Sequence, residues 1–165
     1  ATVNRKLVKI DNAVTYSSLL SATAFSTKSI RCGVTNGNDF WASGDGNAGT
    51  NGVQYFGNGT PCQVSSTKTN LRGVNIFNGQ LYFSTGSAPT GIYAVGTGLP
   101  ITSGTVSTLE IAGVGSSPSP NAFAINAAND VCYVADDRTF ASGGGVVKYP
   151  KTGSVLASRY NLTTR

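Results

Sequence analysis

The chain has 165 residues, which is enough for one domain with a hydrophobic core, and its formal net charge at pH 7 is +5. Only 12% of the residues are charged and 39% are hydrophobic, a balance that argues against intrinsic disorder. No stretch approaches the roughly 18 consecutive apolar residues of a membrane-spanning helix, so we expect no membrane span. The basic residues are scattered and do not interleave with aromatic residues, and we therefore expect no nucleic-acid partner.

The abundance of turn-forming and strand-edge residues predicts an all-β fold. Glycine alone contributes 21 residues, and serine, threonine and asparagine are frequent. The chain begins with two short apolar stretches, 6–11 and 14–17, which resemble the later stretches 146–150 and 154–158. Residues 1–27 are therefore predicted to form the outer half of a four-stranded unit.

Three segments that follow share one plan, in which two strands joined by a tight turn precede a glycine-rich loop and a third strand. Their expected strands are 30–34, 40–44 and 52–56; then 71–77, 80–84 and 91–95; then 123–126, 131–135 and 145–149. Arg31 and Arg72 are 41 residues apart, as are Trp41 and Tyr82, whereas Tyr82 and Tyr133 are 51 apart. A period of about 40–50 residues with about four strands per unit is typical of β-propeller blades.

We therefore predict a single all-β domain of about 3.5 four-stranded antiparallel propeller blades. The expected units are 1–27 (an outer half), 28–68, 69–111 and 121–165. Propellers typically have about 4–8 blades, so either a longer chain or other copies of this one are expected to complete the ring. A β-sandwich and a solenoid are the alternative architectures.

The longest repeated stretch carries a resemblance to a known family. Residues 70–84 (NLRGVNIFNGQLYFS), 95–100 (VGTGLP), 102–104 (TSG) and 133–137 (YVADD) resemble the motifs of an uncharacterised family of secreted β-propeller-like repeat proteins of bacteria, algae and plants. The stretches 30–31, 40–44 and 52–55 are also similar, so the resemblance spans most of residues 3–150. Members are usually longer, which implies that blades are missing here, and the family brings no established activity.

The absence of histidine excludes Ser-His-Asp and Cys-His nucleophilic systems. Asp45 with Asn47, and Asp136 with Asp137, offer loop oxygens of the kind that calcium prefers, and calcium is the one cofactor that we consider. Turn formation is the favoured role of these aspartates. Gly143 to Gly145 resembles a phosphate-binding loop, but a β-rich stretch follows it, so we expect a hairpin loop.

Several features favour an extracellular or cell-surface location. The sequons at Asn58 and Asn161 are candidate glycosylation sites, and any signal peptide is expected to have been removed already. Three cysteines would leave one thiol beside one disulfide, for which Cys32 and Cys62 are candidates with the connectivity left open. Cys132 replaces Leu81 of the preceding unit and is expected to be a small buried residue.

These observations leave three functional hypotheses. The favoured one is a non-enzymatic extracellular structural or binding module that assembles with other copies of itself or with the remaining blades of a longer chain. The second is a carbohydrate-binding module, with polysaccharide as partner and loop Asn, Asp and aromatic residues as contacts. The third is a metal-dependent hydrolase or lyase whose site lies in absent blades.

Aromatic residues recur at matched positions of the repeated units. For these residues, packing between blades is favoured over stacking on sugars: Trp41, Tyr55, Tyr82, Tyr93, Tyr133 and Tyr149.

Overall fold

A computed structural model describes residues 6–20, 24–57, 60–150 and 160–161 of the chain. These residues form four antiparallel sheets, in each of which the strands follow one another in chain order. The first sheet contains β1 (Lys6–Ile10) and β2 (Tyr16–Leu20). The second contains β3 (Ile30–Thr35), β4 (Phe40–Gly44), β5 (Gly52–Tyr55) and β6 (Cys62–Ser65).

The remaining two sheets repeat the plan of the second. The third sheet contains β7 (Leu71–Phe77), β8 (Gln80–Thr85), β9 (Gly91–Val95) and β10 (Ser107–Ala112). The fourth contains β11 (Pro120–Ile125), β12 (Val131–Asp136), β13 (Gly145–Pro150) and the two-residue β14 (Tyr160–Asn161). A short 3-10 helix, Phe140–Ser142, lies between β12 and β13.

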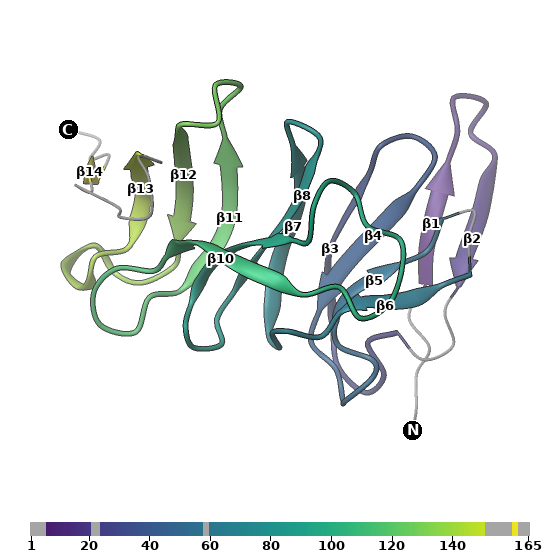
Figure 1. Ribbon diagram of the computed structural model, residues 1–165, viewed down its shortest axis with the longest axis horizontal. Helices are drawn as coiled ribbons and strands as arrows, with labels where there is room; N and C mark the ends of the chain where they lie inside the picture. Colours follow the sequence, from purple (N-terminus) through teal and green to yellow (C-terminus); the bar gives the residue numbers. More distant parts are fainter. Residues whose placement is uncertain (1–5, 21–23, 58–59, 151–159, 162–165) are drawn as a thin grey trace.

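The sheets stand side by side in a row, with β1 and β2 at one end and β13 and β14 at the other (Figure 1). The first strands of consecutive sheets are neighbours, because β7 contacts β3 and β4 on one side and β11 on the other. The all-β antiparallel prediction is confirmed. Within the described residues the row stays open and does not close into a propeller ring.

Local sequence explains the turns and strand starts. Asn78 and Gly79 both have positive φ, 50° and 73°, as the two-residue type I′ hairpin between β7 and β8 requires. Gly52 and Gly91 begin equivalent strands with φ of 76° and 153°. A Cβ at either glycine would lie 2.1 Å from a carbonyl oxygen of the outermost strand, that of Ser65 or of Ile111, so only glycine fits without a backbone shift.

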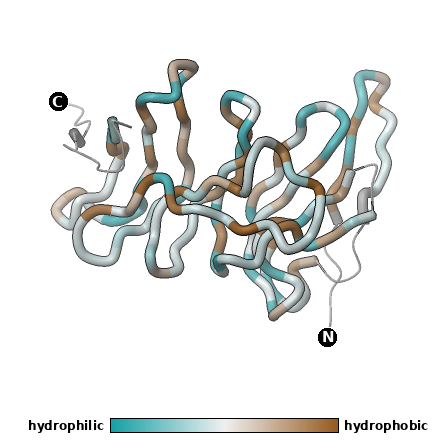
Figure 2. Tube along the Cα trace, in the orientation of Figure 1, coloured by the Kyte–Doolittle hydropathy of each residue, from teal (hydrophilic) through white to brown (hydrophobic). Residues whose placement is uncertain are grey.

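The hydrophobic core is divided into clusters that lie between sheets. Trp41, Val53, Leu71 and Phe83 belong to the cluster between the second and third sheets. Tyr82 belongs to the cluster between the third and fourth sheets, and smaller buried groups pack between the first and second. Figure 2 shows hydrophobic residues along the strands and mostly hydrophilic ones in the turns at their upper ends. Each sheet is therefore stabilised chiefly by burying its faces against its neighbours.

The long loop between β9 and β10 crosses to the preceding sheet. The Trp41 indole Nε1 donates to the Pro100 carbonyl at 2.8 Å, and the Thr105 amide donates to the Val64 carbonyl at 2.9 Å. The loop at 96–106, which contains most of the glycine-rich motif, thus acts as a strap that holds the second and third sheets together, and the buried tryptophan nitrogen gains its hydrogen-bond acceptor there.

Candidate functional site

The first strand of each four-stranded sheet carries a β-bulge at the same place. The pairing register shifts between Ile30 and Cys32, between Leu71 and Val74, and between Pro120 and Phe123. Arg31, Arg72 and Asn121 lie within these three bulges. Because a bulge turns a side chain away from its regular direction, it is the local feature that directs these side chains along the ends of the strands.

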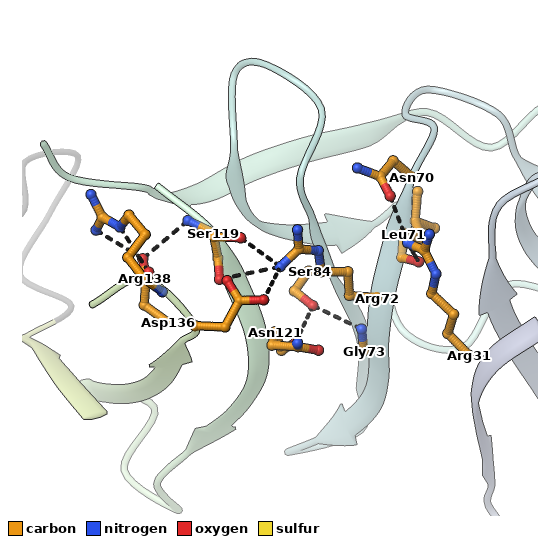
Figure 3. Close-up of polar contacts among 11 residues, drawn as sticks. Arg31, Asn70, Leu71, Arg72, Gly73, Ser84, Ser119, Asn121, Asp136 and Arg138 are labelled. Carbon is orange, nitrogen blue, oxygen red and sulfur yellow. Dashed lines mark hydrogen bonds and ion pairs between the residues drawn. The ribbon is translucent and has the colours of Figure 1, made fainter. Parts of the chain in front are cut away.

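Arg31 connects the second sheet to the third. Its Nη1 donates to the Asn70 side-chain oxygen at 2.6 Å and to the Leu71 carbonyl at 3.1 Å, both at the start of β7 (Figure 3). The contact therefore ties one bulge to the beginning of the next first strand.

Arg72 repeats this contact one sheet further on. Its Nη1 donates to the Ser119 hydroxyl oxygen at 2.7 Å, just before β11, and to Asp137 Oδ2 at 3.1 Å. A guanidinium can serve several acceptors at once, which suits this position between two sheets.

Two equivalent serines provide a second repeated tie. The Ser43 hydroxyl of β4 donates to the Arg72 carbonyl at 3.2 Å, and the Ser84 hydroxyl of β8 donates to the Asn121 carbonyl. Both serines are fully buried. The Ser84 hydroxyl oxygen also accepts from the Gly73 amide at 2.8 Å, so this backbone donor in the bulge of β7 finds its acceptor within the same sheet (Figure 3).

The bulge residues Arg31, Arg72 and Asn121, together with Asn70, line a shallow hollow of about 230 Å³. The lining combines two cations with two amides. Guanidinium and amide groups bind carboxylate and sulfate oxygens, so this hollow is suited to an anionic ligand.

A buried ion pair stands at the end of β12. Arg138 Nε lies 2.8 Å from Asp136 Oδ1, and Arg138 Nη2 lies 2.9 Å from Oδ2, with side-chain exposures of 9% and 2% respectively for the two residues. The guanidinium also donates to the carbonyls of Ser116 and Val114, in the loop before β11. The Ser119 amide donates to the carboxylate at 3.1 Å. This pair therefore anchors the loop that connects the third and fourth sheets.

The ion pair sets the ionisation of its carboxyl. Burial opposes the charged form, but the hydrogen bonds from Arg138 and Ser119 outweigh it and hold the pKa of Asp136 below its ordinary value. A hydrogen bond from Ser119 and the charge of Arg72 likewise lower the pKa of Asp137.

The four calcium candidates are not brought together as one ligand set. Asp45 faces Lys28, whose Nζ lies 3.3 Å from its Oδ2, and the Asn47 carbonyl accepts from Thr50 within the same loop. Asp136 and Asp137 are engaged by Arg138 and Arg72. Among the residues that the structure describes, no three His, Cys, Asp or Glu side chains gather as a potential metal site.

None of the three cysteines forms a disulfide. Cys32 lies on β3 and Cys62 on β6, the two edge strands of one sheet, so the Cα atoms are three strand spacings apart, roughly 14 Å. A disulfide needs Cα atoms within about 7 Å, and this pairing is not made. Burial raises the pKa of the Cys62 thiol. Cys132 is fully buried, as expected.

Most of the matched aromatic residues pack in the core, as predicted. Trp41, Tyr55, Tyr82, Tyr93 and Tyr149 are all buried, and none of these rings is free to stack on a sugar. Tyr133 differs, with 38% of its surface exposed. The Asn58 sequon and the Asn161 side chain lie outside the described residues.

Sequence reasoning recognised the 41-residue spacing of Arg31 and Arg72 but assigned these residues no role. The spacing itself was the signal, because a charged residue repeated at one position of a first strand must meet the next unit in the same way. The ion pair of Asp136 and Arg138 was also missed, although residues two apart in an extended chain point to the same side.

No family model, no curated protein and no solved structure matches this chain. The resemblance to secreted propeller-like repeats therefore stays a prediction. In the part of the chain that the structure describes, no helix has the length and apolar character to span a membrane.

Replacing Arg138 with methionine should destabilise the protein by about 3–5 kcal/mol, because Asp136 would remain buried without its partner. The measurement is the free energy of unfolding from denaturant titration. Lys28→Met is the matched control, since it removes one member of a more exposed pair and should cost about 0–1 kcal/mol. Equal losses in the two variants would contradict the anchoring role of Arg138.

The lowered pKa of Asp136 predicts that the free energy of unfolding depends on pH in the acid range. The unfolded carboxyl titrates near 3.9, so the stabilisation by the Asp136 carboxylate is complete above about pH 5 and is lost as the pH falls through the lower folded pKa. Asp136→Asn lacks this contribution. The difference in unfolding free energy between wild type and this variant should be largest near pH 7 and shrink toward pH 2, and a difference that grows in acid would refute the assignment.

Proposed function

We propose that this chain is a non-enzymatic structural and binding module of an extracellular, propeller-type repeat protein. The observation that carries the proposal is that one interface is built twice. The second and third sheets, and again the third and fourth, are joined by an apolar cluster, a side chain from a bulge and a buried serine. A repeated interface with nearest-neighbour contacts is the construction principle of repeat scaffolds.

The placement of the acidic residues supports a non-enzymatic role. Asp136 is held by Arg138 in a bidentate, buried pair, and Asp137 faces Arg72. A glycosidase needs two carboxylates on either side of one sugar bond. These two instead serve as anchors between sheets, so their charge is already used in holding the fold.

The propeller form is supported by the order of strands within the sheets and by the adjacency of their first strands. β3, β7 and β11 lie next to one another, as inner strands do around a propeller axis (Figure 1). The extracellular location is supported by the low charge, the sequons and the resemblance to secreted repeats.

Equivalent substitutions test the scaffold role. Ser43→Ala should lower the free energy of unfolding by about 1 kcal/mol, because it removes one buried hydrogen bond to the next sheet. Ser84→Ala should lower it by about 1–3 kcal/mol, because it removes the bond to the Asn121 carbonyl and also takes the hydroxyl acceptor from the Gly73 amide. Because Ser43 and Ser84 bond the two sides of the same Arg72–Gly73 peptide unit, the two losses should be coupled, and the loss in the double variant should differ from the sum of the single values. Ser103→Ala, in an exposed loop, is the control and should change little. Losses confined to one of the two serines would contradict a repeated structural role.

The hollow at the bulges favours a second candidate function, the binding of an acidic polysaccharide. Arg31 is exposed and stands beside Arg72 and two amides, a set that suits the carboxylates of uronic-acid sugars. This candidate keeps polysaccharide as the partner but moves the contact from aromatic rings to guanidinium and amide groups.

Arg31→Gln should weaken binding to polygalacturonate by about tenfold, the loss of roughly one charge-assisted hydrogen bond. Lys28→Gln removes the same charge elsewhere and is the control. Binding isotherms at two salt concentrations, with neutral dextran as a second probe, provide the measurement. If both variants weaken binding equally, the interaction is general electrostatic attraction and the hollow is not its site.

A further inference from the structure

The last sheet presents a face that is buried in every preceding equivalent. Trp41, Tyr82 and Tyr133 occupy the same register position of β4, β8 and β12, and their exposed fractions are 0%, 3% and 38%. The first two rings are covered by the sheet that follows. No described residue covers Tyr133 in this way.

The residues around Tyr133 form one continuous apolar surface, which we call the trailing face. Ala122, Ala124, Tyr133, Ala135 and Val146 line a shallow hollow of about 250 Å³ there, whose lining also includes Phe123, a buried residue of the cluster between the third and fourth sheets. Val146 is 42% exposed, whereas Val53 and Ile92 at the equivalent positions of β5 and β9 are fully buried. The register therefore identifies this face as one half of an interface between sheets.

The other half of such an interface lies exposed at the opposite end of the row. The side chain of Leu7 on β1 points toward β3, because its Cδ1 would lie 3.3 Å from a Cβ at Gly33. Since strand residues alternate, Val8 and Ile10 point away from β3, and Tyr16 lies directly opposite Ile10 on β2. We call these three residues the leading face; they are 46%, 67% and 73% exposed.

Resting on the proposed scaffold function, we propose that the trailing face binds the leading face of a second copy of this chain. Each interface inside the chain joins two different faces. One is the face of a sheet that points toward the next sheet along the chain, and the other is the face of that next sheet that points back toward the preceding one. The two uncovered faces have these same opposite orientations, at opposite ends of the row (Figure 1). A second copy supplies both apolar complementarity and the correct direction, and the contact is head to tail rather than symmetric.

Complementary variants test this contact. Ile10→Glu and Tyr133→Glu each place a charge on one face, and each should raise the dissociation constant for self-association at least about tenfold. Both residues are exposed, so the fold should survive, which circular dichroism checks. Val146→Glu should act like Tyr133→Glu. Phe140→Glu is the control, because Phe140 is exposed in the 3-10 helix and lies outside both faces.

Sedimentation velocity of wild type, each variant and an equal mixture of Ile10→Glu and Tyr133→Glu gives the readout. We expect wild type to associate, each variant to be monomeric, and the mixture to form a one-to-one complex, since it restores one intact pair of faces. A monomeric wild type at about 100 µM would overturn the inference, as would Ile10→Glu that still dimerises, which would mean a symmetric contact. Neither result affects the proposed scaffold function, which the serine substitutions test separately.

Discussion

The structure depends on how each first strand is held against the next. Apolar clusters fill the space between the sheets, but hydrophobic attraction is non-directional and would tolerate sliding. The bulge side chains and buried serines fix the alignment, because Arg31, Arg72, Ser43 and Ser84 donate to defined acceptors on or next to the following sheet. Apolar burial thus provides the stability of the row, and the hydrogen bonds provide its geometry.

This division of labour explains why the polar residues are poor evidence for catalysis. The buried pair of Asp136 with Arg138 lies at the end of β12, and its guanidinium donates to the loop through which the chain passes from the third sheet to the fourth. A buried pair with satisfied hydrogen bonds is costly to break, and it fixes a loop whose glycine- and serine-rich sequence has little stiffness of its own. The charges of Asp136 and Asp137 are engaged by Arg138 and Arg72 in contacts that join the sheets.

The sequence predicted the strand order and the tight turns because these depend on local patterns. The 41-residue spacing and Asn78-Gly79 are examples, and both correspond to what the structure contains. The two-residue spacing of Asp136 and Arg138 is a local signal for their pairing, but the loop carbonyls of Val114 and Ser116 that Arg138 reaches depend on which sheet edge meets which loop. No short pattern contains that information. The exposure of Tyr133 could not be foreseen either, since its register position is the same as that of two buried rings.

The glycines that open β5 and β9 limit how such a chain can change over time. At Gly52 and Gly91 the carbonyl oxygen of the outermost strand occupies the space of any Cβ. A mutation to any other residue would push that strand outward, and the outer edge of the sheet would lose its pairing. Glycine is therefore the one residue that these two positions accept for as long as the fourth strand of the sheet keeps its pairing.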